Sequence, residues 1–358
     1  METLRHQKSS LRQLAARVAS LLPLVVATAL ASTSFAKIKD GDIQVRSLQC
    51  VDITVDDMNR SLAFYTHVLP FRKVSDVELA GADYEKLEGI FGLRMRVVDL
   101  KLGNETLELT EYLTPKGRPY PPDVKSNDRS FQHVAIIVRS MAEAYASLKK
   151  RGVRYASTGP QRLPDWNKSA GGIEAFYFKD PDGHTLEILQ FPSDKGPEKW
   201  HKTTRDLFLG IDHTAIVVNN SDESLKLYRE VLGFKVAGES MNYGIEQEHL
   251  NNVEGAKLRI TRMSPPAGPS VEFLEYLNPR DGKPAPSDTK ATDLWHWQTR
   301  FVVNDVAVAI RTLSSAGYSF VSKDSVQLKN APLGFSKAAT FRDADGHEIQ
   351  IVSSGAIR

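Results

Sequence analysis

Four short apolar runs divide the chain into segments of similar design. They are CVDITV from Cys50, HVAIIV from His133, HTAIVV from His213 and QTRFVV from Gln298. Each run is strand-like and is followed within a few residues by apolar positions spaced by four and three, which predict a helix. These positions are Met58, Leu62 and Tyr65; Met141, Tyr145 and Leu148; a looser set at Leu225, Tyr228 and Leu232; and Val306, Ile310 and Leu313.

The residues after each helix alternate between apolar and polar, as in RMRVVDLKL, TLELTEYL, GGIEAFYF and VEFLEYL. A period of two is typical of strands. Each quarter of the chain therefore predicts a strand, a helix and about three further strands. This is an α+β design, in which helices cover one face of a mixed or antiparallel sheet and leave the opposite, concave face for a ligand.

Helix ends agree with these boundaries. Ser140 and Glu143 have the spacing of a capping box at a helix start. Gly152, Gly233 and Gly317 stand where a helix is expected to stop.

Three motifs recur at an interval of 163 or 164 residues, which indicates a duplication. SLAFYTHVLPF (61–71) returns as SLKLYREVLGF (224–234), ELTEYLTP (108–115) as EFLEYLNP (272–279), and DPDGH (180–184) as DADGH (343–347). We expect one domain at 42–192, with modules of about 45–115 and 128–192, and a second domain at 207–354, with modules of about 207–280 and 293–354. A charged, Pro-containing linker at 193–206 joins them.

The first 36 residues differ from the rest. Four basic residues precede the apolar run Val18–Ala31, and Ser34-Phe35-Ala36 forms a small-x-small cleavage site. This is the plan of a secretory signal peptide, cut after Ala36, and the run is shorter than the roughly 20 residues that span a bilayer. We therefore expect a periplasmic or secreted protein without stable membrane insertion after cleavage.

Composition narrows the classes of partner. Without residues 1–36 the chain has 42 basic and 43 acidic residues, so no basic excess favours nucleic acid. Cys50 is the only cysteine, which excludes an intrachain disulfide. A small molecule is the expected partner, and the oligomeric state is left open.

Three glutamates lie between apolar neighbours on predicted strands: Glu108, Glu187 and Glu272. Because strand side chains alternate, each carboxylate faces away from those neighbours, toward the opposite surface of the sheet. In a closed concavity such carboxylates need a cation or hydrogen-bond donors, whereas on an open surface water suffices. His133 and His213 begin equivalent strands 80 residues apart, which favours a shared role over two unrelated core histidines.

A strand–helix–three-strand module that occurs four times and carries FYTHVLPF, DPDGH and a last strand with Glu resembles the vicinal oxygen chelate (VOC) superfamily. That superfamily includes glyoxalase I, extradiol dioxygenases and bleomycin resistance proteins. The resemblance implies two tandem VOC domains, with metal ligands at the start of each module's first strand and on its last strand. Carried over, these positions are Cys50, His133, His213 and Gln298 for the first strands, and Glu108, Glu187, Glu272 and Gln350 for the last strands.

Module pairing decides which of these residues meet. Pairing within each repeat would group Cys50 and Glu108 with His133 and Glu187, and would leave His213 and Glu272 with two glutamines. Pairing across the repeats, as glyoxalase-I-like proteins often do, groups His133, Glu187, His213 and Glu272 as one complete metal site. The degenerate second site is then Cys50, Glu108, Gln298 and Gln350. We favour crossed pairing, because one complete site and one degenerate site is the simpler account.

Two imidazoles and two carboxylates suit a divalent ion such as Zn, Ni, Co, Mn or Fe(II). The resemblance then implies a glyoxalase-I-like lyase or isomerase that acts on a small vicinal-oxygen substrate through a metal-bound enediolate, with Glu187 or Glu272 as the catalytic base. The alternatives are an extradiol-type Fe(II) ring-cleaving dioxygenase and a non-catalytic binding or resistance protein.

Other residues carry weaker expectations. Cys50 is expected to be a small buried residue rather than a nucleophile. His184 and His347 follow Asp-Gly, which favours a role in the turn. Trp295 and Trp297, beside Gln298, are candidate walls of a substrate pocket.

Overall fold

The computed structural model describes residues 43–322, 324–329 and 331–353, all of which belong to one compact unit. The expected signal peptide, residues 1–36, lies outside the described residues. Within the described ranges, no helix is long and apolar enough to cross a membrane.

The chain forms the four expected modules. The first contains β1 (Val45–Thr54), α1 (Met58–Ala63) with a π turn η1 (Phe64–Val68), β2 (Arg72–Lys73), β3 (Val77–Ala80), α2 (Ala82–Glu88), β4 (Arg94–Leu102) and β5 (Glu105–Thr114). The second contains β6 (Gln132–Val138), α3 (Met141–Lys150), β7 (Arg154–Tyr155), β8 (Gln161–Arg162), β9 (Glu174–Lys179) and β10 (Thr185–Gln190). The linker carries a 3-10 turn, η2 (Glu198–His201).

The second repeat has a similar order of elements, with one strand where the first repeat has β2 and β3, and one where it has β7 and β8. Its first module contains β11 (Phe208–Val217), α4 (Ser221–Leu225) with a π turn η3 (Lys226–Val231), β12 (Lys235–Tyr243), α5 (Ile245–Asn251), β13 (Lys257–Ser264) and β14 (Ser270–Asn278). Its second contains β15 (Trp297–Val303), α6 (Val306–Ser315), β16 (Val326–Gln327), β17 (Lys337–Arg342) and β18 (Glu348–Ser353). The α+β class with four strand–helix–strand modules is confirmed, and the small helices α2 and α5 are additions that the sequence pattern did not predict.

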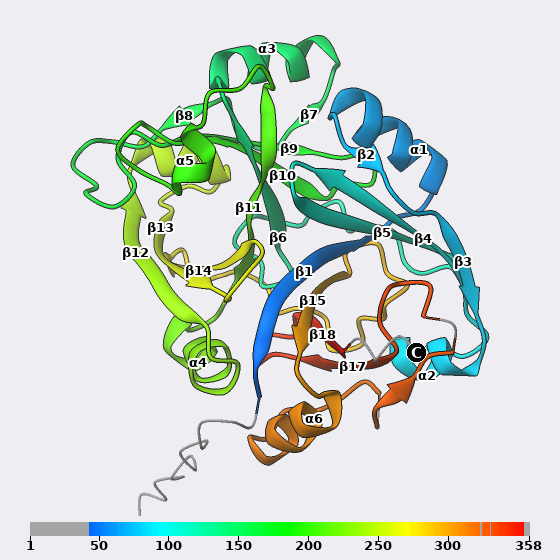
Figure 1. Ribbon diagram of the computed structural model, residues 1–358. Helices are drawn as coiled ribbons and strands as arrows, with labels where there is room; N and C mark the ends of the chain where they lie inside the picture. Colours follow the sequence, from blue (N-terminus) through cyan, green and yellow to red (C-terminus); the bar gives the residue numbers. More distant parts are fainter. Residues whose placement is uncertain (1–42, 323, 330, 354–358) are drawn as a thin grey trace, which may run out of the picture. The chain divides into compact units, whose positions relative to one another are not determined.

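The modules pair across the repeats. One nine-stranded sheet has the strand order β16-β17-β18-β15-β1-β5-β4-β2, with β3 also paired to β4. The other nine-stranded sheet has the order β12-β13-β14-β11-β6-β10-β9-β7, with β8 also paired to β9. The first and fourth modules therefore join through the antiparallel pair β1–β15, and the second and third join through β6–β11. Figure 1 shows β1 beside β15, and β6 beside β11. The preference for crossed pairing is confirmed by this strand order.

The helices α1, α3, α4 and α6 lie on the outside of the strands (Figure 1), where their apolar positions join one continuous core. Met58, Met141 and Val306 all belong to this core and are at most 3% exposed. The neighbours of the strand glutamates, such as Leu186 and Ile188, point into the same core. Because side chains alternate along a strand, the glutamates face the opposite side of each sheet, as the pattern predicts.

Local signals mark most helix ends correctly. Ser140 accepts a hydrogen bond from the Glu143 amide (3.3 Å), whereas the Glu143 side chain pairs with Arg139 (2.7 Å). The cap is therefore half of the expected capping box. Gly152, placed after α3, has a φ of 69°, a conformation that favours glycine.

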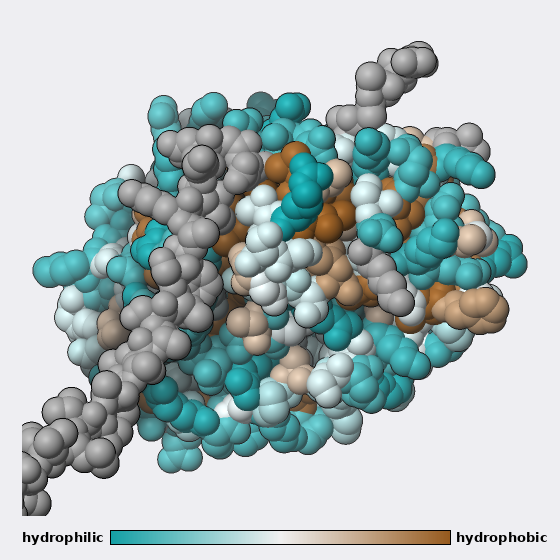
Figure 2. Space-filling model, turned by 90° about the horizontal axis from the view of Figure 1, so that it is seen from below, coloured by the Kyte–Doolittle hydropathy of each residue, from teal (hydrophilic) through white to brown (hydrophobic). Residues whose placement is uncertain are grey.

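Two long connections lie against each other. They are residues 115–131 and 279–296, and each covers the end of a module. Arg118 bonds through its backbone and its side chain to Asp293, and the amide of Lys283 donates to Asp128 (2.8 Å). The approach is close, because a Cβ atom at Gly117 would lie 1.9 Å from the carbonyl oxygen of Thr292. The surface seen in Figure 2 is largely hydrophilic, with smaller hydrophobic areas between the polar side chains.

Candidate metal centre

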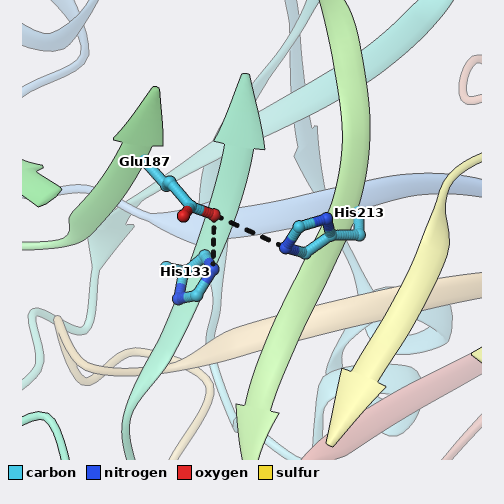
Figure 3. A group of neighbouring side chains, drawn as sticks. All are labelled: His133, Glu187 and His213. Atoms are coloured by element: carbon cyan, nitrogen blue, oxygen red, sulfur yellow. Dashed lines mark ion pairs between the residues drawn. The ribbon is translucent and has the colours of Figure 1, made fainter. Parts of the chain in front are cut away.

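Three neighbouring strands bring His133, Glu187 and His213 together (Figure 3). His133 is on β6, Glu187 on β10 and His213 on β11. Oε2 of Glu187 lies 3.2 Å from Nε2 of His133 and 3.5 Å from Nε2 of His213. One possible ligand atom from each of the three residues lies within 4.8 Å of the other two. The side chains come from both repeats, so this group exists only because the modules pair across them.

His133 is a buried histidine without hydrogen bonds. The side chain is 1% exposed, and neither ring nitrogen has a hydrogen-bond partner of acceptable geometry, although Nε2 is close to Glu187. An unsatisfied buried ring nitrogen is costly, because it loses its water without replacement. A metal ion between His133, Glu187 and His213 would satisfy it.

Asp212 orients His213. Its Oδ2 lies 2.9 Å from Nδ1 of His213, which keeps a proton on Nδ1 and turns Nε2 toward Glu187. Trp200 of the linker donates to Oδ1 of Asp212 (2.7 Å), and Arg262 binds both carboxylate oxygens. Carboxylates that hold the second nitrogen of a ligating histidine are a recurrent feature of metal sites. The strand pattern did not single out Asp212, although this residue directly precedes His213.

Glu272 on β14 lies at the edge of the group. Its Oε2 is 3.5 Å from Nε2 of His213, while its Oε1 is 3.3 Å from Nη1 of Arg262, which stands opposite it on β13. The tight group of ligand atoms around Glu187 does not include Glu272, which instead groups with Asp212 and His213. The two glutamates are therefore not equivalent: Glu187 faces two imidazoles, and Glu272 is shared between an imidazole and a guanidinium. The sequence did contain a sign of this contact, because Arg262 is a charged residue on an alternating strand.

Charge in the group shifts the pKa values of its members. Burial disfavours ionisation of Glu187, but the two imidazoles outweigh burial and lower the pKa of this carboxyl group. Burial disfavours the imidazolium of His213, but Glu272, Asp212 and Glu187 outweigh burial and raise its pKa to about 10. The metal-free group thus holds a proton that a cation would displace, which makes metal binding dependent on pH.

The group opens into a cavity of about 480 Å³ between the second and third modules. His133, Glu187, His213 and Glu272 all line it, together with Arg262. Small-molecule sites in proteins typically have volumes of about 300–1,000 Å³. The concave side of this sheet is therefore the place where a small substrate can reach the predicted ligands.

The companion position in the other sheet is filled by Arg300. In the pair β1–β15 Cys50 lies opposite Arg300, and in the pair β11–β6 His213 lies opposite Ala135. Arg300 therefore occupies the position that corresponds to Ala135. Its guanidinium donates to Glu108 (2.8 Å), to Gln350 (2.6 Å) and toward the Cys50 sulfur (3.4 Å).

This guanidinium reaches three of the four predicted residues of the degenerate site. The fourth, Gln298, is buried, and its Nε2 has no hydrogen-bond partner. Burial raises the pKa of the Cys50 thiol well above its usual range, more than Arg300 lowers it. An internal cation and a buried thiol therefore stand where the sheet of β6 and β11 holds its ligands.

A further acidic group, Asp180, Asp182 and His184, is a structural turn. Oδ1 of Asp180 accepts the amides of residues 182–184 at 2.8–2.9 Å, and its Oδ2 contacts Nδ1 of His184 and accepts from Tyr65. Arg60 pairs with Asp182. The ligand atoms are already used, which supports the expected role of His184 in the turn. His347 makes the same contact with Asp343 (3.0 Å).

Trp295 and Trp297 lie away from the cavity. Nε1 of Trp295 donates to Thr289 (3.1 Å), and its ring stacks under Arg118. Trp297 is buried against His184. Trp297 begins β15 of the other sheet, and Trp295 lies in the connection just before it. The space beside them is about 30 Å³, which is too small for a substrate.

Comparison with known families agrees with this architecture. The model of the Glyoxalase/Bleomycin resistance protein/Dioxygenase superfamily matches residues 47–188 and again residues 210–351. The chain belongs to this superfamily. The two matched ranges correspond to the two sequence repeats. Each sheet of the fold contains one module from each repeat.

Individual relatives are more distant. The curated lactoylglutathione lyase GLX1 of Arabidopsis thaliana is 27% identical over 184 residues, which is 51% of this chain and 53% of that protein. The chain thus spans about half the length of this curated relative. A crystal structure of glyoxalase I from Zea mays has a TM-score of 0.55 at 16% identity, covering 86% of this chain and 92% of that one. A Bacillus subtilis protein described as a candidate dioxygenase has a TM-score of 0.54 at 15% identity, covering 87% and 86%. Likeness at these identities shows the fold.

Superfamily membership implies a divalent metal, and the side chains present fit one. His133 has two buried nitrogens without partners, and the orientation of His213 is fixed by Asp212. Two imidazoles with one or two carboxylates suit a borderline to hard divalent ion.

Proposed function

We propose that this chain is a divalent-metal-dependent enzyme of the glyoxalase I type, a lyase or isomerase that acts on a small substrate with two adjacent oxygens. The observation that supports this most is the convergence of His133, Glu187 and His213 on one point at the wall of a cavity. When bound there, a divalent ion would polarise the adjacent oxygens of a substrate.

The side chains of this site divide the remaining work. His133, Glu187 and His213 would hold the ion, and Asp212 keeps His213 in the ligating tautomer. Glu272 is the best-placed proton acceptor, because Arg262 holds one of its oxygens while the other faces the group. It would take a proton from the carbon beside one polarised oxygen and return it to the neighbouring carbon, which completes an isomerisation.

A ring-cleaving dioxygenase is the second candidate, and one observation favours it. The tight group contains two histidines and one glutamate, since Glu272 is drawn toward Arg262. Two histidines and one carboxylate with open positions are the ligand set of non-haem Fe(II) oxygenases. The role of Glu272 therefore separates the two candidates.

Metal content tests the site first. Purified wild type and Cys50→Ala should each retain bound metal after reconstitution, whereas His213→Ala should lose it. Loss of metal from Cys50→Ala, with retention in His213→Ala, would refute the site. A wild type that binds no metal would favour a non-catalytic binding protein.

Two reactions then separate the enzymes. The isomerase should incorporate solvent deuterium into an α-hydroxyketone such as dihydroxyacetone, and Glu272→Gln should abolish this incorporation while the metal stays bound. Oxygen uptake with catechol by the Fe(II)-loaded protein, unaffected by Glu272→Gln, would support the dioxygenase instead.

Export is a separate part of the proposal. It depends on the charged, apolar and small-residue segments of the first 36 residues. Amino-terminal sequencing of the protein from its native source should begin at Lys37, and a start at Met1 would refute the cleavage.

A further inference from the structure

The cavity beside the predicted ligands is lined mainly by apolar side chains. They include Leu163, Ile173, Leu189, Phe191, Leu250 and Ile260. Ile173, Phe191 and Ile260 remain partly exposed to the cavity, so a ligand can cover them. Burial of apolar surface is favourable by about 25 cal/mol per Å².

The charged and amide groups of the wall already have partners. Arg262 binds both oxygens of Asp212 and one of Glu272. Glu239 pairs with Arg259 at 3.0 Å. Asn242 accepts from Asn167 (2.8 Å) and donates to Gln247 (3.0 Å).

Lys195 is the exception among the charged wall residues that the structure describes. Its ammonium group contacts the neighbouring Asp194 at 3.4 Å, and that aspartate is 73% exposed on its side chain. Phe191 and Pro197 flank Lys195 along the same wall segment. A single cation is therefore available to a ligand, outside the group of metal ligands.

This count of partners limits the charge that a ligand can carry. A carboxylate placed on the wall without a cation would lose its hydration without compensation. A glutathione adduct carries two carboxylates and one ammonium group, and Lys195 is the one described cation of the wall whose acidic partner is exposed rather than buried. An apolar body, by contrast, finds a complementary surface.

We propose that the substrate is a molecule whose two adjacent oxygens face His133, Glu187 and His213, whose body is apolar, and which carries at most one carboxylate, bound by Lys195. The inference rests on the proposed function, because it assumes that the metal group binds adjacent oxygens. It excludes glutathione adducts as substrates of this site.

Hydroxamic acids test the inference, because they present two adjacent oxygens to a metal. The Co(II)-loaded protein is titrated with acetohydroxamic acid, benzohydroxamic acid, 4-carboxybenzohydroxamic acid and a hydroxamate carried on glutathione, and binding is measured from the cobalt absorption spectrum. Benzohydroxamic acid should bind at least about tenfold more tightly than acetohydroxamic acid, because its ring covers the apolar wall. The glutathione derivative should bind no more tightly than acetohydroxamic acid.

Two variants locate the effect. Ile173→Asn should reduce the preference for benzohydroxamic acid, whereas Ile245→Asn, on an exposed residue outside the cavity wall, should leave it unchanged. Lys195→Met should weaken 4-carboxybenzohydroxamic acid relative to benzohydroxamic acid. Lys149→Met, on the exposed face of α3, should not.

The outcomes are separable. Tightest binding by the glutathione derivative, or equal binding of the acetyl and benzoyl compounds, would overturn the inference while leaving the metal site in place. A protein that binds no cobalt, or a cobalt protein that binds no hydroxamate, would overturn the proposed function together with this inference.

Discussion

Replacement of Arg300 by methionine tests whether this guanidinium is the internal cation of the sheet that contains β1 and β15. The substitution keeps a side chain of similar length but removes the charge, so the Glu108 carboxylate loses two hydrogen bonds while it remains 2% exposed. Oε1 of Gln350 and the sulfur of Cys50 lose this donor as well. Breaking a buried ion pair by removal of one member typically costs about 3–5 kcal/mol.

The assay is equilibrium unfolding in urea, with a matched exposed pair as the control. Arg94 pairs with Glu78, and the two side chains are 58% and 51% exposed. Exposed pairs contribute about 0–1 kcal/mol, so Arg94→Met should change the free energy of unfolding far less than Arg300→Met.

A double variant separates the missing cation from a simple loss of packing. In Arg300→Met with Glu108→Leu no buried charge is left unpaired, and replacement of a whole buried pair by apolar side chains is often neutral. The double variant should therefore be more stable than Arg300→Met alone. Equal loss in the single and double variants, or a loss in Arg300→Met no larger than in Arg94→Met, would refute the reasoning.

Three further predictions concern other parts of the molecule. Asp212→Asn should lower the affinity for Co(II) by about 10–100-fold in a metal titration, because it weakens the group that orients His213. Burial raises the pKa of Glu88 to about 7, so its stabilisation is present below pH 4.5 and is lost as the pH rises through 7. Glu88→Gln should remove this decline, of at most about 3 kcal/mol, in urea unfolding at pH 5 and pH 8. Gly117→Ala should destabilise the fold by about 1–3 kcal/mol in the same assay, because its Cβ would collide with the Thr292 carbonyl.

Each of these has its own control. Asp206→Asn, in the linker, should leave cobalt affinity unchanged, and equal loss in both variants would remove the special role of Asp212. A wild type whose stability is the same at pH 5 and pH 8 would refute the prediction for Glu88. Gly159→Ala meets no atom within 4 Å, so a loss as large as in Gly117→Ala would contradict the steric argument.

The sequence by itself determined the module, because its signals are local. Apolar spacing located α1, α3 and α6, and glycines marked where helices end. Alternation along single strands showed that Glu187 and Glu272 face away from the core, since successive side chains point to opposite faces. The repeats then identified equivalent positions, and so the four residues that the first site brings together.

Only the tertiary structure decided which modules meet. All four carry similar first strands, so local pattern cannot tell whether β6 pairs with β1 or with β11. That choice depends on how whole modules dock, which involves contacts distant in the sequence. The same holds for Arg300, whose partners Glu108 and Cys50 are 192 and 250 residues away. A charged residue in an apolar strand is unusual, so Arg300 could be noticed in the sequence. Its role depends on Glu108 and Cys50, which reach it only when the first and fourth modules dock.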